Sequence, residues 1–151
     1  MDARMPNPAT SVPGALDALL ALAAAAGASG LAQTTIDLVH LRASQINGCS
    51  VCVQMHATDL RKNGQSDDRI FAVAAWRDAP YFTDEERAAL ALTEHATRLA
   101  DRSDPVPTEV FDAAAKLFSE PQLASLVLHI ALINAFNRIN ATTGQLAGAG
   151  S

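Results

Sequence analysis

The sequence has few cysteines, few aromatic residues and no cluster of basic residues. Two of its 151 residues are cysteines, 5% are aromatic, and its 11 lysines and arginines are scattered along a chain with 16 acidic residues. The formal net charge is −5. A nucleic-acid-binding domain normally carries a basic patch or stripe, so we expect no nucleic-acid partner.

Long hydrophobic runs are missing as well. No stretch of about 18 uncharged apolar residues occurs, which argues against a membrane span. The alanine-rich segment 15–28 is interrupted by Asp17 and lacks the basic lead and the cleavage site of a secretory signal. We therefore expect a cytoplasmic protein with no membrane partner. In a reducing cytoplasm, a close pair of cysteines is more often catalytic or metal-binding than structural.

Alanine and leucine are abundant, and both lose little side-chain entropy in a helix. No segment alternates apolar and polar residues as a half-buried strand would. The sequence therefore predicts an all-α, single-domain helical bundle of about seven helices. We expect residues 14–140 to form the domain, between a flexible lead at 1–13 and a flexible tail at 141–151. Apolar spacing, capping residues and breaks place the helices near 14–26, 34–46, 49–62, 66–76, 83–102, 108–118 and 121–140.

The segment from Asn47 to His56, with the sequence NGCSVCVQMH, carries the chemistry. A helix that starts at or beside Cys49 places Cys52 one turn inside it and His56 on the same face as Cys52. The free N–H groups at the helix start, the imidazole and the neighbouring thiol each lower a thiol pKa from about 8.5 towards neutrality. The same spacing lets the two sulfurs meet, so one cysteine could resolve a sulfenic acid on the other.

Three other interpretations of the cysteine pair are less favoured. A c-type haem site requires histidine directly after the second cysteine, where this chain has Val53. A purely structural disulfide would close so short a loop that it removes little entropy from the unfolded chain. A zinc site stays open as an alternative, with Cys49, Cys52 and His56 as ligands and a fourth from His40, His95 or His129.

The segment LVHLRASQINGCSVCVQMHATDLRKNG (38–64) resembles the signature of the carboxymuconolactone decarboxylase superfamily, in its alkylhydroperoxidase D-like branch. The resemblance continues through 70–97 and 133–140 and covers about residues 14–140. It implies an all-helical fold, a homo-oligomer, and reduction of hydroperoxides by the cysteine pair. Superfamily members that decarboxylate carboxymuconolactone lack this pair, so its presence argues against that reaction.

The resemblance also implies roles for individual residues. Cys52 matches the attacking thiol, Cys49 the resolving thiol and His56 the histidine of a proton relay. An external dithiol or protein thiol would restore the enzyme, and neither an organic cofactor nor a metal is required. Chains of this branch commonly carry a glutamate twelve residues before the first cysteine, and this chain has Asp37 there. Asp37 is a candidate member of the relay, but Thr34-x-x-Asp37 also has the spacing of a capping box, and the two interpretations are equally open.

For the remaining polar residues on apolar helices we favour structural roles. His40, about one turn beyond Asp37, could join the relay, but a position at the surface or against a partner is favoured, and His129 is expected in the core or at an interface. His95 could line the site, but a pair with Glu94 on a helix surface is favoured. Asn137 and Arg138 are expected to cap other helix ends or to cross a subunit interface.

Three functions are therefore considered. The leading hypothesis is a thiol-dependent hydroperoxide reductase. The second is a redox-responsive adaptor that uses the same disulfide as a switch, and the third is a lyase or isomerase with His56 as its base. Apolar residues around most of the helix 123–139 exceed what a small monomer needs to bury, which also predicts a homo-oligomer, a dimer or an assembly of trimers.

Overall fold

Helix-forming residues and well-defined caps make the chain helical throughout the part that the structure describes. The computed structural model describes residues 2–148, where it contains eight α-helices and one 3-10 helix and no strand. This confirms the all-α prediction, but the short helix Pro8–Ser11 was not expected and the single helix expected at 66–76 is divided into two. The elements are α1 (Pro8–Ser11), α2 (Ala15–Gly27), α3 (Gln33–Asn47), α4 (Ser50–Lys62), α5 (Asp67–Ala72), η1 (Val73–Asp78), α6 (Asp84–Thr97), α7 (Thr108–Ala115) and α8 (Glu120–Thr143).

Two capping boxes expected from the sequence start the helices that follow them. The Thr83 hydroxyl accepts a hydrogen bond from the Glu86 N–H, and the Glu86 carboxylate accepts one from the Thr83 N–H at 2.9 Å. At the start of α8, the side-chain oxygen of Gln122 accepts from the Ser119 N–H at 3.0 Å. Side chains thus satisfy backbone donors that a helix leaves free at its first turn.

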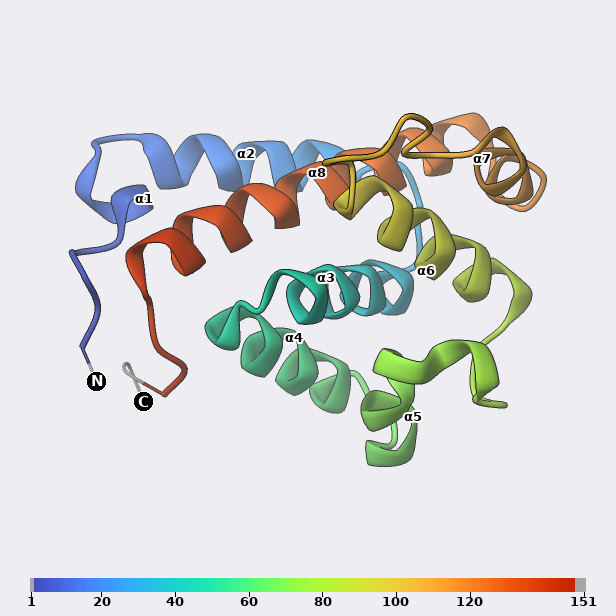
Figure 1. Cartoon of the computed structure of the whole chain (residues 1–151), viewed down its shortest axis with the longest axis horizontal. Helices are drawn as coiled ribbons and strands as arrows, with labels where there is room; N and C mark the ends of the chain where they lie inside the picture. Colours follow the sequence, from blue (N-terminus) through green and yellow to red (C-terminus); the bar gives the residue numbers. More distant parts are fainter. Residues whose placement is uncertain (1, 149–151) are drawn as a thin grey trace.

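Helix α3 lies at the centre of the molecule and packs against α4, α6 and α8 (Figure 1). Five successive residues, 35–39, are buried on it, as expected for a helix whose apolar positions are nearly continuous. One hydrophobic cluster joins α3 to α6 and α8 and includes Val39, Leu92 and Leu126. A second cluster joins α3 to α4, α5 and α6 and includes Leu41, Leu60 and Leu90. The two cysteines belong to a third, small cluster with Ala43 and Ile133.

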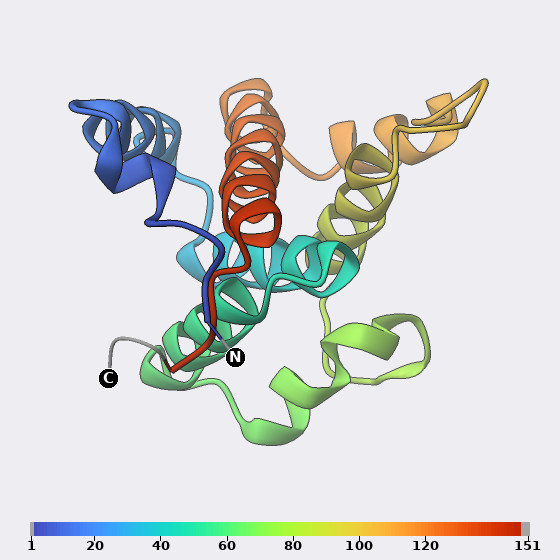
Figure 2. The same ribbon diagram turned by 60° about the vertical axis from the view of Figure 1, so that its left-hand side comes forward.

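The two ends of the chain lie side by side (Figure 2). The Arg4 N–H donates to the carbonyl of Thr143 at 2.8 Å, and Gln145 Nε2 donates to the carbonyl of Met5 at 3.0 Å. The lead expected to be flexible over 1–13 therefore contains α1 and is hydrogen-bonded to the end of α8. The tail expected from residue 141 begins later, because α8 continues to Thr143. Residues 1 and 149–151 of these two segments lie outside the described part of the chain, and the domain limits stay a prediction.

Helix α8 is long and apolar enough to cross a membrane by its length and composition alone. Core helices pass the same test, and α8 packs against α2, α3 and α6. It also carries the buried polar residues Asn134, Asn137 and Asn140, whose side chains bond to other parts of the fold. These contacts identify α8 as a core helix.

Candidate functional site

The cysteine pair sits where one helix ends and the next begins. Helix α3 ends at Asn47 because Gly48 takes a left-handed conformation with φ of 68°, which a glycine adopts without strain. Cys49 then has extended backbone angles and occupies the N-cap position of α4. Its sulfur accepts a hydrogen bond from the Cys52 N–H at 3.3 Å. The break and helix start expected from the sequence are therefore confirmed, and they place Cys49 at the positive end of the helix dipole.

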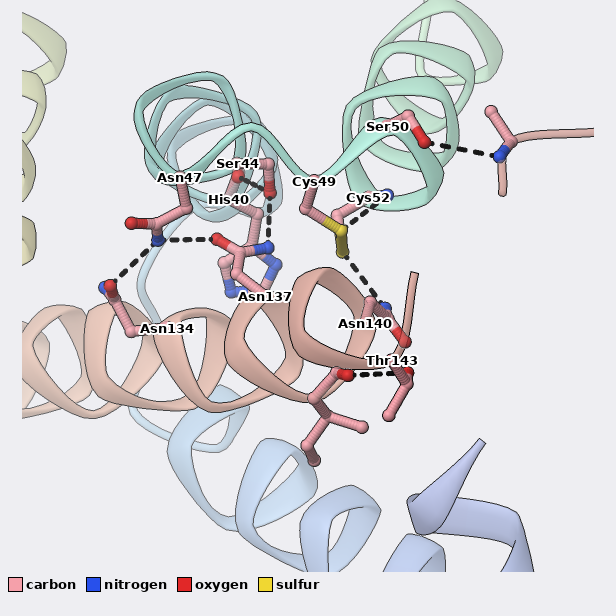
Figure 3. The surroundings of a disulfide bond; sticks show 12 residues. His40, Ser44, Asn47, Cys49, Ser50, Cys52, Asn134, Asn137, Asn140 and Thr143 are labelled. Carbon is pink, nitrogen blue, oxygen red and sulfur yellow. Dashed lines mark hydrogen bonds between the residues drawn. A yellow bond between two sulfur atoms is a disulfide. The ribbon is translucent and has the colours of Figure 1, made fainter. Parts of the chain in front are cut away.

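Cys49 and Cys52 are joined by a disulfide bond, with their Cα atoms 5.4 Å apart (Figure 3). Both are buried, but Cys49 lines a cavity of about 260 Å³. The cavity lies between the start of α4, the end of α8 and the N-terminal segment, and its other lining residues include Asp2, Arg4, Ser50 and Asn140. Across residues 2–148, no three histidine, cysteine or acidic side chains are grouped so that they could hold a metal ion. The zinc alternative therefore gains no support from these side-chain positions.

Three histidines from three helices lie together, and one of them, His56, is on the same helix as Cys52. The ring of His56 on α4 lies edge-on to that of His40 on α3, with 4.8 Å between ring centroids. The ring of His40 lies 5.2 Å from that of His129 on α8. Among residues 2–148, neither ring nitrogen of His56 or His129 has a hydrogen-bond partner. His40 is half-buried, with its ring in contact with those of His56 and His129, and the buried position expected for His129 is confirmed.

These histidines are held in the neutral form near pH 7. Burial lowers the pKa of His56 to about 4, and the nearby carboxylate of Asp59 opposes this shift only in part. Burial also lowers the pKa of His40 well below its ordinary value, and repulsion from His56 and His129 adds to the effect. A neutral imidazole has a free lone pair, so His56 is able to accept a proton at neutral pH.

Asp37 does not occupy the capping position that the sequence suggested. Helix α3 begins at Gln33 after Ala32, which has no capping side chain, so Asp37 is the fifth helical residue and the capping-box interpretation is wrong. Its two carboxylate oxygens accept from Gln33 Nε2 at 2.9 Å and from Asn63 Nδ2 at 2.7 Å. Burial raises the pKa of Asp37, and these two bonds oppose the rise. In the described part of the chain, the carboxylate within ion-pair distance of His56 is Asp59, whose Oδ2 lies 3.9 Å from His56 Nδ1.

Asp59 was not predicted as a site residue, although its i, i+3 spacing from His56 could have indicated it. Asn140 was not predicted either; its Nδ2 donates a hydrogen bond to the sulfur of Cys52 at 3.3 Å (Figure 3). No local pattern links these two residues, because 88 positions separate them. Contact between α4 and the end of α8 arises only in the folded chain.

Asn137 has the helix-end role expected of it. Its side-chain oxygen accepts from Asn47, the last residue of α3, at 2.9 Å, and its Nδ2 donates to the Ser44 hydroxyl at 3.0 Å. These bonds hold the end of α3 against α8. Arg138 donates within α8, to the backbone and side-chain oxygens of Asn134.

The surface pair expected for His95 and Glu94 is wrong. Glu94 is buried, and its carboxylate accepts from Arg42, Trp76 and Arg77. Burial raises the pKa of Glu94, but the bonds from these donors outweigh it and lower the pKa to about 2. The Nδ1 atom of His95 instead lies 3.3 Å from the carbonyl oxygen of Pro105. Glu94 thus binds α6 to α3 and η1, away from the cysteines.

The chain is similar to known proteins both in sequence and in structure. Residues 13–95 match the Carboxymuconolactone decarboxylase family. The uncharacterized protein YdfG of Bacillus subtilis (strain 168) is 39% identical over 119 residues, which are 79% of this chain and 80% of that protein. The crystal structure of ATU0492 from Agrobacterium tumefaciens has a TM-score of 0.89 and 33% identity, covering 98% of this chain and 99% of that one. ATU0492 is a protein of unknown function that has been suggested to be the antioxidant defence protein AhpD.

The debrominase Bmp8 also has this fold, with a TM-score of 0.76 over 91% of this chain and 73% of its own. Its sequence identity is 21%, so this likeness concerns the fold alone. The family match, the relatives above 30% identity and the paired cysteines at the start of α4 lead to one assignment. The chain belongs to the carboxymuconolactone decarboxylase family, in its alkylhydroperoxidase D-like branch with a CxxC pair.

Proposed function

We propose that this protein is a thiol-dependent hydroperoxide reductase. The observation that carries the proposal is a cysteine pair close enough to form a disulfide at the start of a helix, with a buried histidine that is neutral at pH 7 one turn beyond Cys52 on the same helix. The pair supplies two electrons, and the histidine can take up and return a proton. Similarity to ATU0492, with its suggested role in antioxidant defence, supports the same function.

The oxidative half of the reaction starts from the reduced pair. His56 accepts the proton of the Cys52 thiol, and the thiolate attacks the distal oxygen of the hydroperoxide. The O–O bond breaks, the sulfur becomes a sulfenic acid, and the leaving alkoxide takes the proton from His56 to give an alcohol. The Cys49 sulfur then attacks the sulfenic acid, which releases water and forms the Cys49–Cys52 disulfide. No organic cofactor and no metal takes part in these steps.

The reductive half requires an external dithiol or a protein with a thiol pair. The cavity beside Cys49 supports attack on that sulfur, with Cys52 leaving as a thiolate. The second thiol of the reductant then displaces Cys49, so that one disulfide in the reductant replaces the one in the protein. Such a cycle suits a reducing compartment, and we propose that the protein works in the cytoplasm.

Two carboxylates have separate roles in this proposal. Asp59, next to His56, stabilises the protonated imidazole that forms when Cys52 loses its proton. Asp37 binds Asn63, the residue that ends α4, and so fixes the helix that carries Asp59 and His56. We therefore propose that Asp37 supports the relay through the position of α4.

The proposal is tested by following hydroperoxide loss with the purified protein and an excess of a dithiol. We expect continuous consumption of an alkyl hydroperoxide and formation of one alcohol for each dithiol oxidised. A brominated pyrrole supplied in place of the peroxide tests the alternative suggested by the fold of Bmp8. Bromide release without peroxide consumption would replace the proposed function by debromination. Disulfide formation without turnover on either substrate would favour a redox-responsive adaptor.

We also propose that the protein forms a homo-oligomer through an apolar groove between α7 and α8. The groove has a volume of about 470 Å³, and its exposed side chains Phe111, Val127 and Leu128 would be buried by a second copy. Val127→Asp is expected to convert the oligomer to a monomer, because it would place a charge in a desolvated interface. Light scattering measures the mass, and Phe71→Asp, at an exposed phenylalanine on α5, is the control. A monomeric parent protein at micromolar concentration contradicts the prediction.

A further inference from the structure

Asn140 is the one side chain outside α4 that is hydrogen-bonded to a sulfur of the pair within residues 2–148. It lies near the end of α8, is 8% exposed, and directs Nδ2 at the sulfur of Cys52 from 3.3 Å (Figure 3). An amide carries an N–H₂ donor at one end and an oxygen acceptor at the other. Whether Asn140 favours a thiolate or opposes it therefore depends on which end faces Cys52.

A helix cap at the other end of the chain sets this orientation. The side-chain oxygen of Asn7 accepts from the Ala9 N–H at 2.9 Å, which caps α1. Because this oxygen is occupied by the cap, the Nδ2 atom of Asn7 faces Asn140 and donates to its Oδ1 at 2.9 Å. With its oxygen bound to Asn7, Asn140 presents the N–H end to Cys52. The orientation of both amides thus follows from one backbone donor in α1.

We propose that Asn140 is a catalytic residue that stabilises the Cys52 thiolate through its amide N–H, and that Asn7 is a positioning residue that keeps this N–H turned towards the sulfur. The inference rests on the proposed function in one respect, namely that Cys52 is the reacting thiol. A thiolate accepts a hydrogen bond more strongly than a thiol or a disulfide sulfur, since bonds to a charged partner are roughly twice as strong as neutral ones. The bond therefore lowers the pKa of Cys52.

The same bond serves both halves of the cycle. A lower pKa increases the fraction of Cys52 that is thiolate at neutral pH and able to attack an oxidant. It also makes Cys52 the better leaving group when a reductant attacks Cys49. In the disulfide form Asn140 is already in place, so no rearrangement precedes release of the thiolate.

The test measures the pKa of Cys52 directly, without any peroxide. The reduced full-length protein is labelled briefly with an alkylating agent over a range of pH, and mass spectrometry reports each cysteine separately. Asn140→Leu removes the donor at nearly constant volume and is expected to raise the pKa of Cys52 by about one unit, given what a hydrogen bond to a charged group contributes. Alkylation of Cys52 near pH 7 should slow by about tenfold as a result.

Two further variants separate the thiolate bond from general support of the fold. Asn7→Ser keeps a good cap for α1 but removes the donor to Asn140, so the pKa of Cys52 should rise in the same direction by less. Asn134→Leu is the matched control, because Asn134 is an equally buried amide on α8 that bonds to Asn47 and Thr97 and not to a sulfur. It should lower the thermal midpoint and leave the pKa of Cys52 unchanged.

The other titratable and charged groups that face the pair are His56 on α4, His40 on α3, and Asp2 and Arg4 of the N-terminal segment. All four groups are present in every variant, so they affect each curve of Cys52 alkylation rate against pH equally. An unchanged pKa in Asn140→Leu, or equal shifts in Asn140→Leu and Asn134→Leu, would overturn the inference. Because alkylation needs no turnover, a protein that fails to consume peroxide can still confirm the thiolate bond, and the two proposals fail separately.

Discussion

Replacement of Cys52 by serine is expected to reduce dithiol-dependent hydroperoxide consumption to the rate of the buffer. A serine hydroxyl stays protonated beside a neutral imidazole at pH 7 and cannot attack the peroxide as a thiolate does. Cys49→Ser should behave differently, because Cys52 remains able to react once. Without added dithiol it is expected to consume a single equivalent of peroxide and then to stop with one oxygen atom added to Cys52, because no second thiol is present to reduce the sulfenic acid.

Rapid mixing followed by mass spectrometry of both variants measures this asymmetry. Cys49, and not Cys52, is the N-cap residue and lines the cavity. The structure therefore also allows the opposite assignment of the two roles. If Cys49→Ser loses the first equivalent and Cys52→Ser retains it, the roles of the two cysteines are exchanged. The Asn140 contact would then act on the resolving thiol.

Acidification from pH 6.5 to pH 4 is expected to destabilise the fold by roughly 3 kcal/mol through His56 alone. The ordinary pKa of the residue is 6.5, and burial lowers it to about 4 in the folded protein. Between these values the unfolded chain binds the proton and the folded chain does not, so stability falls as the pH falls. The effect is absent above pH 6.5, and His40 acts in the same direction.

Denaturant unfolding at a series of pH values measures this loss, with His56→Gln as the comparison. The variant does not titrate at position 56, so its stability should fall less steeply between pH 6.5 and 4.5. Below pH 4.5 protonation of Glu94 adds a further loss in both proteins, because its pKa is lowered to about 2 in the folded state. Parallel curves for the parent and His56→Gln would show that His56 is not held in its neutral form by burial.

The sequence predicted those parts of the site that depend on interactions between residues close together in the chain. Asn47-Gly48 ends α3, Cys49 starts α4, and the spacing of Cys49 and Cys52 lets their sulfurs join. Each of these follows from glycine geometry, helix periodicity or the free N–H groups of a first turn. The predicted roles of Cys49, Cys52 and His56 in catalysis remain proposals.

Contacts between distant segments could not be obtained in this way. The ring of His129 reaches His40 only because α8 crosses α3, and Asn140 reaches Cys52 at the far end of the same helix. Asn7 lay in a segment that its prolines suggested to be flexible, yet its bond to Asn140 spans 133 positions of the chain. A single sequence holds no local signal for such pairs.

Asp37 shows how a small boundary shift changes an interpretation. The capping-box prediction required α3 to begin after Thr34, but α3 begins at Gln33, which puts Asp37 a full turn inside the helix. Helix ends are the least certain part of a sequence-based prediction, and a cap depends on the exact residue. The side chain therefore meets Gln33 and Asn63 instead of the backbone of the first turn.

The central claim is that the Cys49–Cys52 pair delivers two electrons to a hydroperoxide. It is tested most directly by mixing the reduced protein with one equivalent of an alkyl hydroperoxide, without reductant, and counting thiols and products. We expect loss of both thiols, one intramolecular Cys49–Cys52 disulfide, and one alcohol per chain. Unchanged thiols with the hydroperoxide left intact would contradict it.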